Sequence, residues 1–333
     1  MRSKILIMAI LFGLIACQEK NPINKPKEKE LVSNFDKAIE QNPYNAEAYF
    51  NRGQSFYLSS KLIAAKKDFD KAIEIDSLYI PALKFRARIQ FEKNQFQEAL
   101  KDLSLCLKYA PEEEEIYIDV AKIYLFTMQY QKAIDHVNAA LKINKYNSEA
   151  YFIKGYCYKE AKDTLRATSA FQTTIEQNPN HLNAYMQLAL FAFDKNDPLC
   201  VEYYNQAIRI APQNQEAFYG KGLYYQQNKA YKQAIKTYQD LLSINHQSEK
   251  AYYNLGYVYL LMDSLDRSYK HFNAACRVAP AYDNAYYNRG LVAERLARYQ
   301  SAMQDFRQTL SLNPDHILAN EGLERVKLIL KDK

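Results

Sequence analysis

The chain carries nearly the same hexapeptide three times, and this repetition restricts its possible folds more than any other feature. AYFNRG spans residues 48–53, AYYNLG spans 251–256 and AYYNRG spans 285–290. Gly256 and Gly290 are 34 residues apart, whereas Gly53 and Gly256 are 203 apart, one short of six times 34. The sequence therefore predicts tandem repeats of 34 residues, with one residue deleted between the first and last copies.

Eight full repeats can be counted. Their first residues, each taken as position 1, are Ala46, Ile80, Glu114, Ser148, Leu182, Gln215, Glu249 and Asp283. Only the repeat that begins at Leu182 has 33 residues, and we place its deletion in a turn near Asn196. Position 8 is Gly or Ala throughout, position 20 is always small, and position 32 is Pro in five repeats. Small residues let two helices approach closely, and proline stops a helix, so the helix boundaries are predicted to recur with the same period.

Positions 2–14 and 18–31 of each repeat carry large apolar residues three or four apart, which predicts two amphipathic helices per repeat. This pattern resembles the tetratricopeptide repeat, which has an aromatic residue at positions 4 and 11, a small residue at 8, Ala at 20 and 27 and Pro at 32. Position 4 usually holds Tyr where the family has Trp, and the chain has 29 Tyr and no Trp. These tyrosines are Tyr49, Tyr117, Tyr151, Tyr185, Tyr252 and Tyr286.

The resemblance, which covers residue 31 to the end, implies an all-α solenoid: a right-handed superhelix of about eight helical hairpins over 46–316. Residues 31–45 are expected to form an N-terminal half-repeat helix, and residues 317–333 a capping helix. In the latter, Ala319, Leu323, Val326 and Leu330 form one apolar stripe opposite a polar face. A stack of hairpins needs such an end, because each hairpin buries its apolar face only against a neighbour.

Residues 1–16 have a separate character. Arg2 and Lys4 precede an apolar run over 5–15 that is too short to cross a bilayer as a helix, as in a signal peptide. The sequence Leu-Ile-Ala-Cys that ends at Cys17 resembles the lipobox of bacterial lipoproteins, which implies that Cys17 is acylated, for example with palmitate, and becomes the new N-terminus. An ordinary secretory peptide, or a buried Cys17, is the alternative.

Residues 17–30 are expected to be the lipidated cysteine and a disordered tether, because the segment is polar and holds two prolines. Gln18 in place of Asp implies, by the same resemblance, delivery to the outer membrane of a bacterial envelope; whether the protein faces the periplasm or the outside stays open. The protein would then be anchored to the membrane rather than span it.

No motif in the sequence points to catalysis, a cofactor or a metal. The five histidines lie at positions 23, 32 and 34, without the spacing of a zinc site, and we interpret them as surface or turn residues. Cys106, Cys157, Cys200 and Cys276 are interpreted as buried thiols. Gly220 and Gly222 lie in a helical pattern rather than a phosphate loop, and the acidic run 112–115 reads as a solvated helix start. Basic residues are matched by acids nearby, which argues against nucleic acid as a partner.

In the family, the first helices of successive hairpins line a concave groove through positions 2, 5, 6, 9, 12 and 13. Many of these positions are apolar here, which favours a protein or peptide segment as the partner. The predicted groove residues are Phe50, Asn51, Tyr57, Phe85, Arg88, Phe91, Phe152, Tyr156, Gln187, Phe193, Tyr219, Tyr253, Asn254, Tyr257, Tyr287 and Asn288. The asparagines at position 6 resemble part of a ladder that holds a peptide backbone in some family members. Alternatively, the aromatic residues pack on the neighbouring repeat and the asparagines are idle.

One specific family function fails on its residues. In the family, the clamp that binds chaperone C-termini uses three successive repeats: Lys at position 5 and Asn at 9 of the first, Asn at 6 of the second, and Lys at 2 and Arg at 6 of the third. Lys84 and Arg88 begin such a set here. The following two repeats have Asp119, Glu149 and Ile153 at the required positions and do not continue it. We therefore expect a membrane-anchored, non-catalytic scaffold that assembles envelope machinery for secretion, pili or outer-membrane biogenesis. The alternative is an adaptor that regulates envelope enzymes acting on cell wall or polysaccharide.

Overall fold

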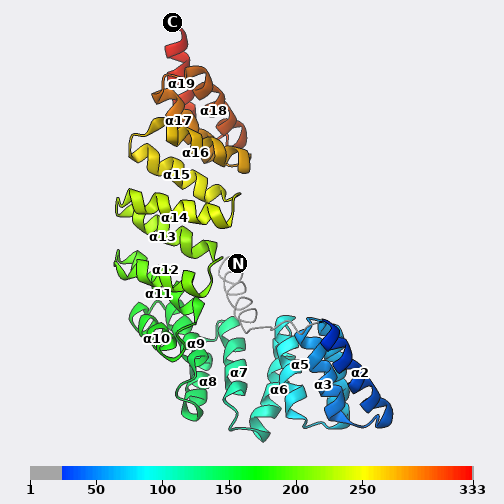
Figure 1. The fold of residues 1–333 in the computed structure, drawn as a ribbon. Helices are drawn as coiled ribbons and strands as arrows, with labels where there is room; N and C mark the ends of the chain where they lie inside the picture. The colour runs from blue at the N-terminus through cyan, green and yellow to red at the C-terminus, as the bar shows by residue number, and fades with distance from the viewer. Residues whose placement is uncertain (1–24, 332–333) are drawn as a thin grey trace. The chain divides into compact units, whose positions relative to one another are not determined.

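The structure is a computed structural model that describes residues 25–331, and within them every regular element is an α-helix (Figure 1). Cys17, the predicted signal peptide and most of the predicted tether lie outside the described residues. The chain divides into two compact units, an N-terminal unit that ends at Pro179 and a C-terminal unit that begins at Asn180. Each unit is a stack of helical hairpins, which confirms the predicted all-α repeat fold.

The N-terminal unit contains one lone helix and four hairpins. Its helices are α2 (Lys25–Gln41), α3 (Ala46–Leu58), α4 (Leu62–Ile75), α5 (Ile80–Glu92), α6 (Phe96–Tyr109), α7 (Glu114–Phe126), α8 (Tyr130–Ile143), α9 (Ser148–Glu160) and α10 (Thr164–Gln177). Odd-numbered helices from α3 onwards are the first helices of hairpins, and each packs on the even-numbered helix that follows it. The lone helix α2 packs on α3, in the role of the predicted half-repeat.

Helix α2 begins at Lys25, earlier than the predicted start at residue 31, so the end of the predicted tether is helical. The physical reason is composition: Lys and Glu are good helix formers, and Pro26 is the second residue of the helix, where its missing N–H breaks no helical bond.

The C-terminal unit contains four hairpins and a final helix, stacked in chain order in Figure 1. Its helices are α11 (Leu182–Asp194), α12 (Leu199–Ile210), α13 (Gln215–Gln227), α14 (Tyr231–Ile244), α15 (Glu249–Leu261), α16 (Leu265–Val278), α17 (Asp283–Arg295), α18 (Tyr299–Leu312) and α19 (Ile317–Lys331). Helix α12 has 12 residues, whereas α14 has 14. The deletion thus shortens the start of one second helix, next to the predicted turn.

In six of the eight hairpins an aromatic ring at position 24, or at its equivalent Tyr204 after the deletion, lies under the small residue at position 8; Leu103 and Val137 take this place in the other two. Phe69, Phe171, Tyr238, Phe272 and Phe306 are all fully buried. A Cβ added to Gly222 would lie 2.4 Å from Cε1 of Tyr238, so glycine is required for this approach. Gly220 is equally close to Tyr204 of the preceding hairpin. Gly220 and Gly222 are therefore packing residues, as their helical pattern indicated.

Helix α19 closes the stack with one apolar side. Ala319, Leu323 and Val326 are buried against Phe306, whereas Asn320, Glu321 and Glu324 are exposed. The final helix therefore covers the last hairpin with its apolar stripe and presents its polar residues to water, as the sequence pattern predicted, although Ile317, Leu318 and Leu328 are exposed as well.

Candidate protein-binding surface

In the N-terminal unit, charged side chains on the first helices pair with one another. Lys84 of α5 lies 2.5 Å from Oε2 of Glu113 and 3.2 Å from Oε2 of Glu115, at the start of α7. Arg88 donates from Nε to Asp119 at 2.8 Å and approaches Glu115 at 3.3 Å. The acidic run before and within α7 is therefore not merely a solvated helix start. Its carboxylates pair with Lys84 and Arg88 of α5.

These pairs shift the pKa values of their members. Burial alone would lower the pKa of Lys84, but its bonds to Glu113 and Glu115 raise it. Burial, the largest single effect, likewise opposes the charge of Arg88, but the attraction and hydrogen bond of Asp119, together with the attraction of Glu115, raise the pKa of Arg88. Burial acts to raise the pKa of Glu115, yet Lys84 and Arg88 hold it below the ordinary value. Both cations that would begin a chaperone-type clamp are thus already engaged within the chain.

Six predicted groove residues are buried: Phe50, Phe152, Tyr156, Gln187, Asn254 and Asn288. For these residues the prediction of an open groove position is wrong. Phe50 shows the reason, since its ring packs against Phe69, Tyr79 and Phe85 with centroids 5.5–5.9 Å apart. Position 5 therefore points toward the aromatic at position 24 of its own hairpin, and the next repeat covers it.

The asparagine ladder is also a wrong prediction for α15 and α17. Asn254 donates to the backbone oxygen of Lys250 at 2.8 Å, and Asn288 donates to that of Asn284 at 2.8 Å and to the Tyr253 hydroxyl at 3.1 Å. Both amides bond within the chain and are more than nine-tenths buried, so they offer little to a passing peptide backbone.

The other predicted groove residues are half-buried: Asn51, Tyr57, Phe85, Arg88, Phe91, Phe193, Tyr219, Tyr253, Tyr257 and Tyr287. Several of them support the next repeat. The Tyr253 ring contacts Phe272 and Tyr282, with centroids 5.5 and 5.0 Å away, and Tyr287 packs on His316 at 4.7 Å. The alternative interpretation, that aromatic residues at these positions pack on neighbouring repeats, is therefore correct for part of the set.

The C-terminal unit has a different first-helix face, with apolar side chains at positions 5 and 9 that lie one helical turn apart. We call this set the apolar strip; it consists of Met186, Leu190, Tyr219, Leu223, Tyr257 and Leu291. All six are partly open to solvent, and Leu190 is 45% exposed. Because α11, α13, α15 and α17 contact one another in order, the strip continues from helix to helix. Sequence reasoning named Tyr219 and Tyr257 as site residues but did not separate this unit, whose positions 5 and 9 carry no charge, from the N-terminal unit, where several of these positions are charged.

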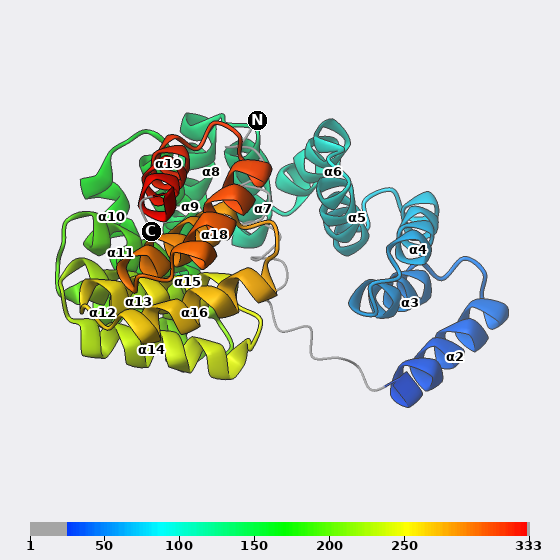
Figure 2. The ribbon, with the colours of Figure 1, turned by 90° about the horizontal axis from the view of Figure 1, so that it is seen from above.

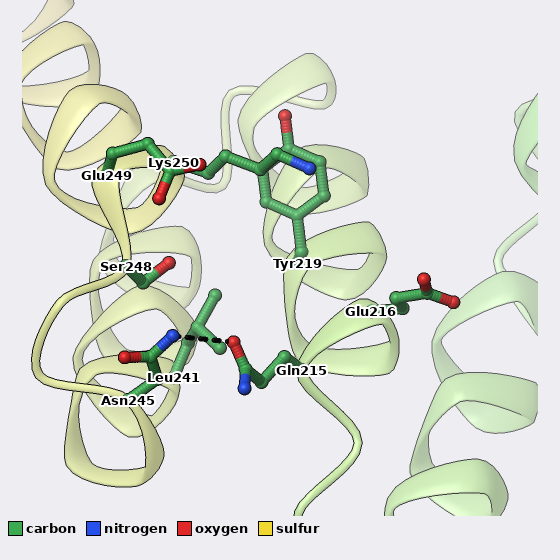
Figure 3. Close-up of a pocket in the computed structure, with 8 residues that line it drawn as sticks. All are labelled: Gln215, Glu216, Tyr219, Leu241, Asn245, Ser248, Glu249 and Lys250. Atoms are coloured by element: carbon green, nitrogen blue, oxygen red, sulfur yellow. Dashed lines mark hydrogen bonds between the residues drawn. The ribbon is translucent and has the colours of Figure 1, made fainter. Parts of the chain in front are cut away.

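A pocket of about 360 Å³ lies between α13 and α15 at the edge of the strip (Figure 3). It is lined by Gln215, Glu216, Tyr219, Leu241, Asn245, Ser248, Glu249 and Lys250. Asn245 donates to the side chain of Gln215 at 2.8 Å, which links the end of α14 to the start of α13. The ammonium group of Lys250 lies 5.5 Å from the centroid of the Tyr219 ring.

Four histidines of the described chain cap helices or pack on aromatic rings. His181 and His316 cap helices by accepting from the backbone N–H of Ala184 and Ala319, both at 3.2 Å. His136 and His271 differ from the expected surface histidines, because each lies half-buried beside two tyrosine rings.

The four described cysteines are free and buried, as predicted, and burial raises the pKa of Cys157 to about 12. Within residues 25–331 no group of His, Cys, Asp and Glu is arranged to hold a metal ion. No helix of that described range has the length and apolar character needed to cross a membrane.

Comparison with known proteins agrees with this architecture. Five models described as "Tetratricopeptide repeat" match residues 34–67, 149–181, 201–249, 249–282 and 283–316, which together span more than half of the chain. The chain belongs to the tetratricopeptide repeat family.

Curated relatives and one solved structure extend the comparison. Tetratricopeptide repeat protein 6 of Homo sapiens is 26% identical over 196 residues, covering 56% of this chain and 36% of that protein. The BBSome complex member BBS4 homolog of Drosophila melanogaster is 23% identical over 272 residues, covering 68% and 55%. The chain thus spans only about a third to just over half of these relatives. The C-terminal part of a TPR repeat-containing protein from Cytophaga hutchinsonii has the same fold, with a TM-score of 0.63, 18% identity and coverage of 71% of this chain and 98% of that one.

Proposed function

We propose that this protein is a non-catalytic scaffold that binds a segment of another protein along the apolar strip. The observation that carries the proposal is the contrast between the two units. Charges on the first-helix face of the N-terminal unit are paired within the chain, whereas the strip leaves leucine and tyrosine side chains partly open to water. A continuous apolar surface of this kind is typical of partner binding.

Membership of the repeat family supports the same role. The fly relative is, by its name, a member of a complex, and assembly with other proteins is the kind of role proposed here. Extended or helical segments fit a surface that offers an apolar side chain at each helical turn.

We also propose that the scaffold is held on a bacterial outer membrane by a lipid at Cys17, and that it assists assembly of an envelope machine. The support is the lipobox-like sequence that ends at Cys17 and the charged and apolar segments before it. Metabolic labelling with an alkyne analogue of palmitate should label the wild-type protein in its native host and leave Cys17→Ser unlabelled. Equal labelling of both proteins would contradict the anchor.

A photo-crosslinking amino acid tests the binding surface. Placed at Tyr257 or Leu223, it should capture a discrete envelope protein, whereas at Lys270, which is exposed on the second helix α16, it should not. Leu190→Ala together with Tyr257→Ala should reduce capture at Leu223 by about tenfold or more, since a central anchor often contributes ~1–2 kcal/mol. Tyr253 is unsuitable as a probe, because it packs on Phe272 and Tyr282.

Two outcomes would change the assignment. Equal crosslinking from Lys270 and from the strip would refute the strip as the binding surface. Capture of cell-wall or polysaccharide hydrolases in place of assembly components would favour an adaptor of envelope enzymes.

A further inference from the structure

Helix α2 has the sequence markers of a second helix but is not preceded by a first helix. It packs on α3, the first helix of the next hairpin, and the described chain contains no first helix before it. Figure 2 shows α2 at the outer end of the N-terminal unit, with α3 beside it. Counted back from Pro43 at position 32, Phe35 and Ala38 of α2 hold positions 24 and 27. We call these two residues the open face of α2.

Positions 24 and 27 are buried in every complete hairpin but not in α2. In the eight hairpins the side chains at these two positions are at most 2% exposed. Phe35 and Ala38, by contrast, are both only partly buried. The difference between α2 and the other second helices is therefore one of cover, because the residue types at these positions are alike.

Phe306 shows how a ring at position 24 is covered. A Cβ atom added to Gly290, at position 8 of the same hairpin, would lie 3.0 Å from this ring, and one added to Gly322 of the next helix would lie 2.7 Å from it. The ring is thus enclosed between two first helices. Phe35 has only the later of these helices, α3, so its open side is the one that the first helix of its own hairpin would cover.

Two sources of cover within this protein do not fit the open face. Cleavage before Cys17, as proposed above, leaves residues 17–24 ahead of α2, which are fewer than the 13 residues of a first helix such as α3. Helix α19 of a second copy has Asn320 and Glu324 at positions 4 and 8, where an aromatic and a small residue are needed. A lipid surface is not favoured either, because α2 contains four lysines and four acidic residues and so has no net charge to attract anionic lipids.

We propose that the open face of α2 binds an amphipathic helix of a partner protein, packed as the first helix of a completed hairpin. Each hairpin of the chain shows the cover that such a face takes, a helix with Gly or Ala at position 8. The partner helix therefore places a small residue on Phe35 and apolar residues about one turn to either side of it. This surface is separate from the apolar strip, and only the length of the segment before α2 depends on the proposed anchor.

The test uses the full-length protein with isotope-labelled alanine methyl groups. The probe is a peptide with the sequence of α17, which carries Tyr286, Gly290 and Ala293 at positions 4, 8 and 11. The peptide is stapled on its outer side, because so short a helix is marginal alone. The Ala38 methyl resonance should shift saturably with this peptide. A peptide with Gly290→Leu should bind about tenfold more weakly or worse, since a large residue keeps the helix away from the Phe35 ring.

Protein variants locate the site. Phe35→Ala should weaken binding by about fivefold or more, because it removes the central ring. Ile63→Ala, which shortens an exposed apolar side chain of α4, should leave binding unchanged. The two peptides are compared on the unchanged protein, so the test stays decisive even when Phe35→Ala loosens α2. Leu190→Ala with Tyr257→Ala should not affect peptide binding although it reduces capture at the apolar strip, so the two surfaces are tested separately.

Three outcomes would overturn the proposal. Equal affinity for the two peptides would show that the open face does not select a small residue. A dimer in sedimentation that Phe35→Ala dissociates would make a second copy the occupant. Binding of phosphatidylglycerol vesicles by the Cys17→Ser protein, lost in Phe35→Ala, would make a lipid surface the occupant. Failure of crosslinking at the apolar strip would refute the proposed scaffold surface and leave the open face of α2 standing, because the peptide assay does not involve the strip.

Discussion

Arg86 donates two hydrogen bonds to Asp102, from Nε to Oδ2 and from Nη2 to Oδ1, both at 2.7 Å. The two residues hold positions 7 and 23 of one hairpin, and the same arrangement joins two other pairs, Arg52 with Asp68 and Arg289 with Asp305. Each arginine also reaches the preceding second helix, as Arg86 does to Asp70 at 3.0 Å. The arginine of AYFNRG and AYYNRG therefore ties one hairpin to the one before it.

Arg86→Ala is expected to lower the free energy of unfolding by about 2–4 kcal/mol, because it leaves the carboxylate of Asp102 buried without a partner. Arg325→Ala is the matched control. Arg325 makes the same two-bond contact with Glu294, but its side chain is 50% exposed, so its loss should cost less than about 1 kcal/mol. Urea unfolding followed by circular dichroism gives both values. Equal losses would show that burial is not what gives the Arg86 pair its strength.

Gly222→Ala is expected to destabilise the protein by about 1–3 kcal/mol, because the new methyl group would lie 2.4 Å from the buried Tyr238 ring. The better helix propensity of alanine returns at most about 1 kcal/mol. At Gly290 the nearest atoms would be 3.0 Å away, so Gly290→Ala should cost distinctly less. Thermal unfolding of both variants measures the order, and a larger loss at Gly290 would contradict it.

Ala297→Gly is expected to stabilise the protein by about 0.5–1 kcal/mol. Ala297 has φ 56°, a left-handed conformation in which a Cβ is strained, and glycine relieves the strain. Ala161 follows helix α9 with φ −75°, so Ala161→Gly relieves nothing and should be neutral or destabilising. The midpoint of urea unfolding should therefore rise in Ala297→Gly and fall or stay unchanged in Ala161→Gly. A gain of similar size in both variants would show that the conformation of Ala297 is not the cause.

Stability should fall as the pH drops below about 6.5. Burial lowers the pKa of His136 and of His271, whose ring stacks on Tyr259 at 5.3 Å. The unfolded chain then binds protons below the ordinary histidine pKa of about 6.5 more readily than the folded protein does, which favours unfolding. The stability that comes from keeping these two histidines neutral is fully present above pH 6.5 and is lost as the pH falls below it.

The measurement is the melting temperature between pH 5.5 and 7.5. Changing His136 and His271 to Phe keeps a stacking ring and should flatten the profile in this range. His246→Asn, at an exposed turn, should leave it as steep as in the wild type. An unchanged slope in the double Phe variant would assign the pH dependence to other groups.

The repeat pattern allowed the fold to be predicted to the level of single helices, because glycine, alanine and proline mark each hairpin. The site was predictable only in part. Periodicity says which side of a helix a residue lies on, but not whether a large neighbour covers it, so Asn288 was placed in the groove although the Tyr253 hydroxyl lies 3.1 Å away. The charge pairing of Lys84 with Glu113 spans 29 residues and becomes visible only when position 5 of one repeat is compared with the start of the next.

A second feature left almost no signal in the sequence. The residue at position 15 of every hairpin has positive φ, and none of the eight is glycine. They are Ser60, Asn94, Met128, Lys162, Asn196, Lys229, Asp263 and Ala297. Only asparagine and aspartate are common in this conformation, so residue type alone does not reveal the turn. The packing of the two helices fixes it instead.

Helix α19 also determines what happens at the end of the molecule. It covers the fully buried Phe306, and the side it turns outward is mostly polar, with Ile317, Leu318 and Leu328 also exposed. A chain truncated after Leu312 would expose that ring on an apolar surface that α19 otherwise covers. An exposed apolar patch of this kind favours association between molecules. The last fifteen described residues thus shield this surface from unwanted contacts as well as completing the stack.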